Sequence, residues 1–146
     1  MSAGSAHTCG VTASHTAYCW GYNASVQLGD GSTTLSSTPV AVAGGIGFVA
    51  VSAGGTHTCG VTASGTAYCW GDNSGGQLGD GSTSPSSTPV AVAAGLSFVA
   101  ASAGSLHTCG VTTGGTAYCW GYNAFGQLGN NSTTSSTVPV KVAGQP

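Results

Sequence analysis

Six cysteines are the residues of this 146-residue chain whose type and spacing carry the most chemistry. They occur as three pairs, with nine residues between the partners of each pair: Cys9 and Cys19, Cys59 and Cys69, and Cys109 and Cys119. A cysteine pair can form a disulfide, remain as two buried thiols, or bind a metal ion as thiolates. The elements that carry the two partners decide between these chemistries.

Each pair lies on two strand-like segments, which in the first copy are residues 7–12 and 16–21. The three residues between them suit a tight hairpin whose last residue, His15, adopts a positive φ angle. This hairpin places Cys9 directly opposite Cys19, with Cβ atoms about 4.5–5.5 Å apart, close to the distance that a disulfide spans. We therefore expect three disulfides, each worth ~2.5–3 kcal/mol through closure of a short loop. Disulfides require an oxidising compartment, which predicts an extracellular or secreted protein.

A zinc site is the alternative that His7 suggests, since it lies two residues before Cys9 on the same strand face. His7, Cys9 and Cys19 supply three ligands, whereas structural zinc takes four and usually has two cysteines separated by two to four residues. That short spacing is absent from the sequence. The pattern favours disulfides over a metal and predicts no cofactor.

Histidine is well suited to acid–base catalysis, and His7, His57 and His107 occupy equivalent positions in the chain. A general base also needs an orienting partner and a nucleophile close by. The chain has three acidic residues, and two of them, Asp30 and Asp80, lie in turns that an Asp-Gly pair explains by backbone geometry alone. The histidines are therefore expected to be structural, and the protein is predicted not to be an enzyme.

The segments that position these residues recur every 50 residues, and residues 4–50 and 54–100 share 35 identities in 47 positions. We treat residues 1–146 as one repeat domain with units 4–53, 54–103 and an incomplete unit 104–146. Each complete unit holds strand-like segments of the HTCGVT, TAYCWG, PVAV and FVAV kind, which is typical of propeller blades or β-solenoid turns. The last two kinds lack polar alternation, which predicts strands covered on both faces.

Residues 57–81, HTCGVTASGTAYCWGDNSGGQLGDG, resemble the repeat of the regulator of chromosome condensation family, in particular bacterial extracellular-type repeats. Trp70-Gly71, Asn73 and the Gly-Gln-Leu-Gly run at 76–79 stand at the family spacing, and the third unit repeats them. The resemblance implies an all-β, seven-bladed propeller of four-stranded blades, in which the repeated histidine is a scaffold residue. The first unit carries His15 and Val26 at two glycine positions of the pattern, so its loop geometry is the feature that a structure must test.

Charge is the scarcest property of the chain, with 3% charged residues, one basic residue (Lys141) and a net charge of −2. Nucleic-acid binders and polybasic membrane anchors need several lysines or arginines, so neither kind of partner is expected. The longest apolar stretch, residues 39–55, is interrupted by glycines and predicts two short strands instead of a membrane span. Met1 is followed directly by repeat sequence, so no secretory leader is expected in this segment.

Three blades make less than half of the implied ring, and no FVAV segment precedes the first unit or follows PVKVAGQP at 139–146. A blade buries its two faces against neighbouring blades, so an open end exposes apolar surface. We expect an open partial propeller that is completed by head-to-tail homo-oligomerisation, as a ring or a filament. The missing blades of a longer chain are the alternative partner.

A self-assembling extracellular structural subunit is the favoured function, and a secreted interaction or lectin-like module with a protein or glycan ligand is the alternative. Nucleotide exchange on a small GTPase is set aside, because it needs a charged surface that this sequence lacks. Repeated tryptophans and tyrosines, such as Trp20 and Tyr18, are expected to pack between blades. The ligand-facing candidates are loop residues that differ between units: Tyr22, Leu35, Asp72, Tyr122 and Phe125.

Overall fold

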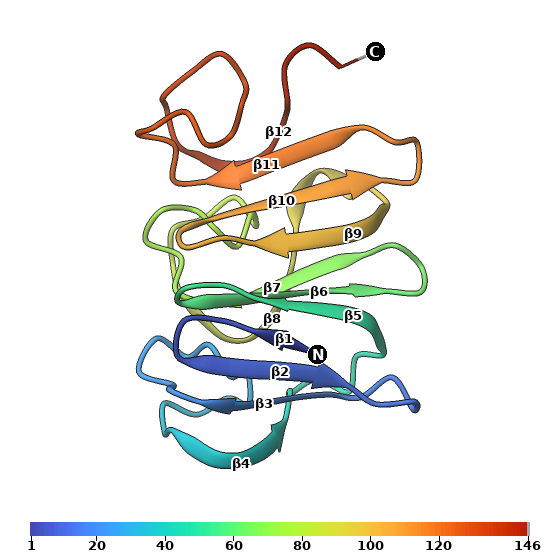
Figure 1. The fold of residues 1–146 in the computed structure, drawn as a ribbon, viewed down its shortest axis with the longest axis vertical. Helices are drawn as coiled ribbons and strands as arrows, with labels where there is room; N and C mark the ends of the chain where they lie inside the picture. The colour runs from blue at the N-terminus through green and yellow to red at the C-terminus, as the bar shows by residue number, and fades with distance from the viewer. Residues whose placement is uncertain (146) are drawn as a thin grey trace.

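The computed structural model describes residues 1–145, which form three four-stranded antiparallel sheets stacked along the long axis of the molecule (Figure 1). The first sheet contains β1 (Ser2–Ala3), β2 (His7–Val11), β3 (Ala17–Gly21) and β4 (Ser36–Ala41). The second contains β5 (Phe48–Ala53), β6 (His57–Thr62), β7 (Ala67–Gly71) and β8 (Ser86–Ala91). The third contains β9 (Phe98–Ala103), β10 (His107–Thr112), β11 (Ala117–Gly121) and β12 (Ser136–Lys141). In every sheet the strands pair in chain order, which confirms the all-β class and the four-stranded blades.

The hairpin between the second and third strands has the predicted register in all three sheets. Cys9 pairs with Cys19 in the first sheet, and the equivalent cysteines pair in the other two. The turn residue His15 has φ 64°, close to the φ of 84° at Gly65 and 79° at Gly115. A single strained residue therefore preserves the turn in the first sheet.

The long loop after each hairpin also keeps one geometry, although the first unit has valine where the others have glycine. Val26 adopts φ 54°, whereas Gly76 and Gly126 have φ values of 82° and 75°. The Val26 amide donates to the Asn23 carbonyl at 3.0 Å, and the Gly76 amide makes the same bond to Asn73. A β-branched residue at positive φ is a backbone outlier that the surrounding loop must compensate. Valine at this position therefore adds backbone strain but leaves the shape of the loop unchanged.

The prediction that the PVAV and FVAV strands are covered on both faces is wrong. Val49 of β5 and Val99 of β9 are 46% and 58% exposed, and β4 consists mostly of exposed residues. These strands form the two edges of each sheet, and β5 contacts β1 and β9 of the neighbouring sheets. At the inner edge, small and β-branched side chains permit close approach of β1, β5 and β9. The outer edge, formed by β4 in the first sheet, faces solvent.

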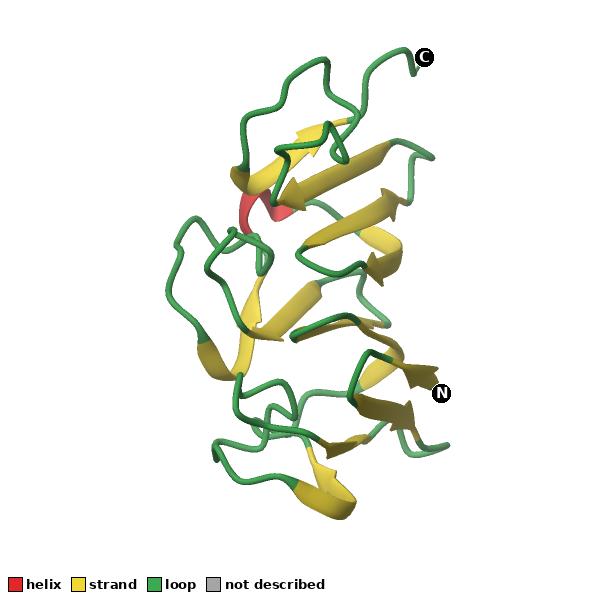
Figure 2. Ribbon diagram, turned by 60° about the vertical axis from the view of Figure 1, so that its left-hand side comes forward, coloured by secondary structure: helices red, strands yellow, loops and turns green. Residues whose placement is uncertain are grey.

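The hydrophobic core lies between the sheets. One cluster joins Leu28 and the Cys9–Cys19 pair of the first sheet to Phe48 and Trp70 of the second. A second cluster repeats this arrangement between the second and third sheets. The long loops after β3, β7 and β11 lie on one side of the stack (Figure 2). Each sheet therefore depends on the next for its burial, as expected of propeller blades.

Candidate functional site: the faces between and beyond the blades

Each internal interface is built from two different faces. The forward face of a sheet presents its disulfide, and the following sheet covers it with a phenylalanine and a tryptophan. Trp70 is fully buried, and its ring centroid lies 5.6 Å from that of Phe48. Trp120 and Phe98 repeat this pair at 5.7 Å against the second sheet. We call the tryptophan side of a sheet its rear face and the disulfide side its forward face.

A backbone carbonyl organises the polar part of the first interface. The Gln27 carbonyl accepts hydrogen bonds from Trp70 Nε1 at 3.0 Å and from the Thr58 hydroxyl at 2.9 Å. His7 Nε2 lies 2.8 Å from the same hydroxyl. Because the single hydroxyl proton of Thr58 is donated to Gln27, His7 Nε2 must be the donor. His7 therefore carries its proton on Nε2, and its buried Nδ1 is left without a partner.

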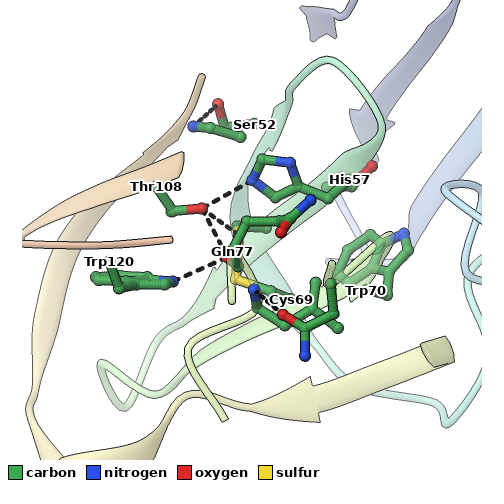
Figure 3. Close-up of a disulfide and its surroundings, with 12 residues drawn as sticks. Ser52, His57, Cys69, Trp70, Gln77, Thr108 and Trp120 are labelled. Atoms are coloured by element: carbon green, nitrogen blue, oxygen red, sulfur yellow. Dashed lines mark hydrogen bonds between the residues drawn. A yellow bond between two sulfur atoms is a disulfide. The ribbon is translucent and has the colours of Figure 1, made fainter. Parts of the chain in front are cut away.

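The second interface repeats this network atom for atom (Figure 3). The Gln77 carbonyl accepts from Trp120 Nε1 at 3.0 Å and from the Thr108 hydroxyl at 2.9 Å, and His57 Nε2 lies 2.8 Å from that hydroxyl. The same regularity extends to the backbone, where Ala53 N donates to Ser2 Oγ and Ala103 N donates to Ser52 Oγ, both at 3.0 Å. Both interfaces therefore follow one pattern of contacts.

The rear face of the first sheet and the forward face of the third have no neighbour in the described chain. Trp20 and Tyr18 on the rear face are only partly buried, in contrast to Trp70. They line a cavity of about 430 Å³ together with Met1, Gly10, Val11, Thr12 and Pro39. On the forward face, Val111 is 39% exposed beside a shallow apolar hollow that includes Cys109 and Ala117. The two ends thus present the forward half of the internal interface and the tryptophan part of its rear half, without the phenylalanine.

The three cysteine pairs are disulfides in the structure: Cys9–Cys19, Cys59–Cys69 and Cys109–Cys119. Their sulfur atoms are therefore not available as thiolate ligands of zinc. Within residues 1–145 there is no group of three histidine, cysteine or acidic side chains placed to hold a metal ion. Disulfides indicate an oxidising environment. No helix in this part of the chain has the length and apolarity to cross a membrane.

The predicted ligand-facing residues lie along the loop side of the stack and do not converge on one pocket. Tyr22, Asp72 and Tyr122 occupy equivalent positions directly after the third strand of each sheet. Tyr22 is 49% exposed, and Phe125 is exposed and lies 6.3 Å from the ring of Tyr122. Asp72 accepts a hydrogen bond from Gln77 Nε2 at 2.8 Å. Their role in binding stays a prediction, as does that of the exposed Leu35.

The interface residues that sequence reasoning missed are Thr58, Thr108 and the carbonyls of Gln27 and Gln77. The His-Thr pair at the start of the second strand and the Gln-Leu-Gly run of the long loop occur in every unit. This regularity was visible, but it does not reveal that a histidine bonds to the threonine of the next unit. A backbone acceptor leaves no side-chain signature at all.

The buried histidines make the interfaces sensitive to acid. Desolvation lowers the pKa of His7 and of His57 from 6.5 to about 4, so both are neutral at pH 7. A histidine with a depressed folded-state pKa stabilises the protein above the unfolded pKa of 6.5 and loses this contribution as the pH falls toward 4. At about 1.4 kcal/mol per pKa unit, His57 alone accounts for a loss of ~2–3 kcal/mol near pH 4.5.

Urea unfolding at pH 7 and pH 4.5 measures this loss, and the variant His57→Gln is the matched control. Glutamine keeps an N–H donor for Thr108 but does not titrate. We expect the variant to lose less stability than the parent between the two pH values. Equal losses in parent and variant would show that the acid sensitivity arises elsewhere.

Sheets stacked through alternating forward and rear faces define the chain as a segment of a β-propeller. A family model described as the regulator of chromosome condensation (RCC1) repeat matches residues 14–61, 64–111 and 114–146, and a second model of this repeat matches 48–77 and 98–127. The chain therefore belongs to the RCC1 repeat family. A search of curated protein sequences finds no significant match.

Solved structures support the same fold. The structure of Prp20p from Saccharomyces cerevisiae, described with its binding to Gsp1p and histones, is 22% identical with a TM-score of 0.85 and covers 96% of this chain and 37% of that one. Human WBSCR16 is 24% identical with a TM-score of 0.87, covering 97% and 36%. The ectodomain of the Physcomitrella patens receptor kinase CR4 is 29% identical with a TM-score of 0.55, covering 83% and 28%. The chain thus spans between 28% and 37% of the length of these proteins.

Proposed function

We propose that this chain is a non-catalytic, extracellular structural subunit whose copies assemble head to tail through their blade faces. The observation that carries the proposal is the correspondence of the two end faces with the disulfide side and the tryptophan side of the internal interface. The forward face of the third sheet has the disulfide and apolar side chains that Trp70 and Trp120 cover elsewhere. The rear face of the first sheet offers the matching tryptophan, Trp20.

The internal networks specify the contacts of such a junction. Gln127 is equivalent to Gln27 and Gln77, so its carbonyl would accept from Trp20 Nε1 and from the Thr8 hydroxyl of the next copy. His107 would donate to that Thr8 hydroxyl, as His7 and His57 do to their threonines. Every polar group of the junction then has the partner that its equivalents have inside the chain. This complementarity argues for a second copy and against an unrelated apolar partner.

Geometry and charge influence the form of the assembly. Forward-to-rear contacts are heterologous, so copies close into a ring or continue as a filament according to the rotation at each junction. Copies of three blades do not add up to the seven blades that the family resemblance implies. A homo-oligomer therefore forms an open filament or a ring with another number of blades. With 3% charged residues, little repulsion opposes close packing of copies.

The test replaces one apolar residue of the forward face with lysine. Val111→Lys buries an unpaired charge at the junction, which costs several kcal/mol and is expected to weaken assembly by at least ~100-fold. Val138→Lys is the matched control, since Val138 is 38% exposed on the same sheet, compared with 39% for Val111, but belongs to the outer strand β12. Light scattering over a dilution series, with electron microscopy, measures the mass and form of the particles.

We expect multiples of the chain mass for the parent and Val138→Lys, and the single-chain mass for Val111→Lys. A parent that keeps the single-chain mass at every concentration would overturn the proposed assembly. The extracellular location is tested separately, by locating the natural protein in cell fractions. Recovery from a reducing compartment would contradict it.

A secreted binding module is the second candidate, and the exposed aromatic residues favour it. Tyr22 and Phe125 present large apolar side chains to solvent on the loop side of the stack. Aromatic side chains of this kind supply contact area to protein and glycan ligands. A binding screen with Tyr22→Ser and Phe125→Ser variants tests this candidate, and it fails if no ligand depends on either residue.

A further inference from the structure

Three asparagines of the chain lie in the pattern Asn-X-Ser/Thr that accepts N-linked glycans: Asn23, Asn130 and Asn131. An asparagine that carries such a glycan lies in a surface loop of a secreted protein. The pattern arises easily in a chain rich in asparagine, serine and threonine, so it does not identify an acceptor by itself. The structure places the three side chains in different surroundings and thereby separates them.

The side chain of Asn23 is fully buried and holds the long loop of the first unit together. Its Nδ2 donates to the carbonyls of Ser32 and Thr34, both at 3.1 Å. Its Oδ1 accepts from Leu28 N at 3.0 Å. A glycan on Nδ2 would break this network, so a chain that carries one at Asn23 cannot form the loop.

The side chain of Asn130 is half-buried and faces into the long loop of the third unit. Its Oδ1 accepts from Asn123 Nδ2 at 3.3 Å. Asp80 makes the equivalent bond with Asn73 Nδ2 at 3.2 Å in the second unit. Asn130 therefore takes the place of an inward-facing aspartate and keeps its contact.

Asn131 is exposed, and it stands where the other two units have glycine. Its φ of 60° lies in the left-handed region, as do the φ values of 85° at Gly31 and 88° at Gly81. Asparagine is one of the few non-glycine residues that this region tolerates. Thr133, which completes the pattern, is exposed as well. The third unit thus keeps the turn and adds an outward side chain that the other units lack.

A following sheet does not cover this position. Gly31 and Gly81 are exposed although the next sheet packs beside them, where Gly31 N donates to the Ser87 carbonyl at 3.0 Å and Gly81 N to the Thr137 carbonyl at 2.9 Å. A Cβ atom added at either glycine comes no closer than 4.0 Å to that sheet. The exposure of Asn131 is therefore a property of the loop, whatever follows the third unit.

We propose that Asn131 is the N-glycan acceptor of this chain and that Asn23 and Asn130 are not acceptors. The donor is a lipid-linked pyrophosphoryl oligosaccharide, from which a transferase of the secretory route moves the glycan. A bond forms between Asn131 Nδ2 and C1 of the sugar, the bond from C1 to the phosphate oxygen breaks, and the pyrophosphate leaves with the electron pair while Nδ2 loses a proton to a base of the transferase. An N-linked glycan is bulky and solubilising, on a chain with 3% charged residues. The site rests on the extracellular location proposed above.

Mass spectrometry tests the assignment on the whole chain, produced behind a cleavable secretion leader in a eukaryotic cell line. Peptide N-glycosidase removes the glycan and converts the modified asparagine to aspartate, which marks the site in the peptide spectrum. We expect this mark at residue 131 and a lower intact mass after treatment. Secreted and cell-retained protein are both analysed. An unmodified chain, or a glycan on Asn23 or Asn130, would overturn the proposal.

Two variants that restore the residues of the other units are matched to each other. Asn131→Gly removes the acceptor but leaves Asn130 in an Asn-Gly-Ser pattern, and Asn130→Asp leaves the pattern at 131–133 intact. We expect complete loss of the glycan in Asn131→Gly and full retention in Asn130→Asp. Modification of Asn131→Gly would contradict the proposal, because the glycan would then be on another residue.

Gly81→Asn transfers the site to a position beside a following sheet, since it creates an Asn-Ser-Thr run at 81–83. We expect a second glycan there and unchanged far-ultraviolet circular dichroism. Absence of that glycan would contradict the argument that a following sheet leaves the position open.

The outcome is separable from that of the proposed function. The leader supplies entry to the secretory route, so occupancy is measured whether or not copies assemble, and light scattering measures assembly on the same samples. A natural protein that is extracellular but unmodified would overturn the glycan site alone. Recovery of the natural protein from a reducing compartment would overturn the location and the glycan together.

Discussion

Replacing Trp70 by alanine is expected to lower the free energy of unfolding by ~3–5 kcal/mol. The indole is fully buried between the first and second sheets and packs against Phe48. Its Nε1 donates to the Gln27 carbonyl, so the substitution removes a hydrogen bond between blades as well as the apolar contact. The alanine leaves a large cavity in a cluster that has few other large side chains. Urea unfolding followed by far-ultraviolet circular dichroism measures the effect.

Trp20→Ala is the matched control, because Trp20 has the equivalent position in the first sheet but lies on an open face. It is partly exposed and lines the cavity on the rear face of that sheet. We expect a destabilisation of the single chain of ~1 kcal/mol, as less apolar surface is lost. If both alanine variants lose the same stability in the Val111→Lys background, the internal interface does not hold the blades together as described.

Local pattern and repetition made much of the fold predictable. The 50-residue period, the tight hairpin and the pairing of Cys9 with Cys19 follow from residues close in sequence, and the structure contains all three. Even the positive φ at His15 follows from its place in the turn. The exposure of Val49 did not follow, because burial of an edge strand depends on how the sheets are stacked. A run of β-branched residues carries no information about that arrangement.

The contacts between blades were less accessible to sequence reasoning than the fold. Trp70 was expected to pack between blades, and it does. Its hydrogen bond to the Gln27 carbonyl was not expected, because the two residues are far apart in sequence and the acceptor is backbone. The pairing of His7 with Thr58 has the same origin, since the histidine–threonine sequence repeats within each unit but bonds across two. Only the stacking of sheets brings these atoms together.

Removing the central disulfide is the second change with a large expected effect. The double variant Cys59→Ala and Cys69→Ala frees a short loop in the unfolded state, which lowers stability by ~2.5–3 kcal/mol. Both sulfur atoms are also buried in the cluster beneath Trp120, so their loss removes packing. Deleting two buried sulfurs adds ~1–2 kcal/mol to the cost. We expect a total of ~4 kcal/mol or more, measured by urea unfolding without reductant.

The disulfide of the third sheet separates the contribution of loop closure to stability from that of sulfur packing. Cys109 and Cys119 close a loop of the same length, but within residues 1–145 no tryptophan covers their sheet face. The double variant Cys109→Ala and Cys119→Ala is therefore expected to lose the loop contribution alone in a single chain. In the proposed head-to-tail assembly, Trp20 of the next copy would cover this disulfide, so the two variants are expected to behave alike in an assembled sample. If the central variant loses more stability than the terminal one as a single chain, and the two lose the same when assembled, the packing over the disulfide is part of the junction. If the two variants lose the same stability in both states, loop closure accounts for the whole effect.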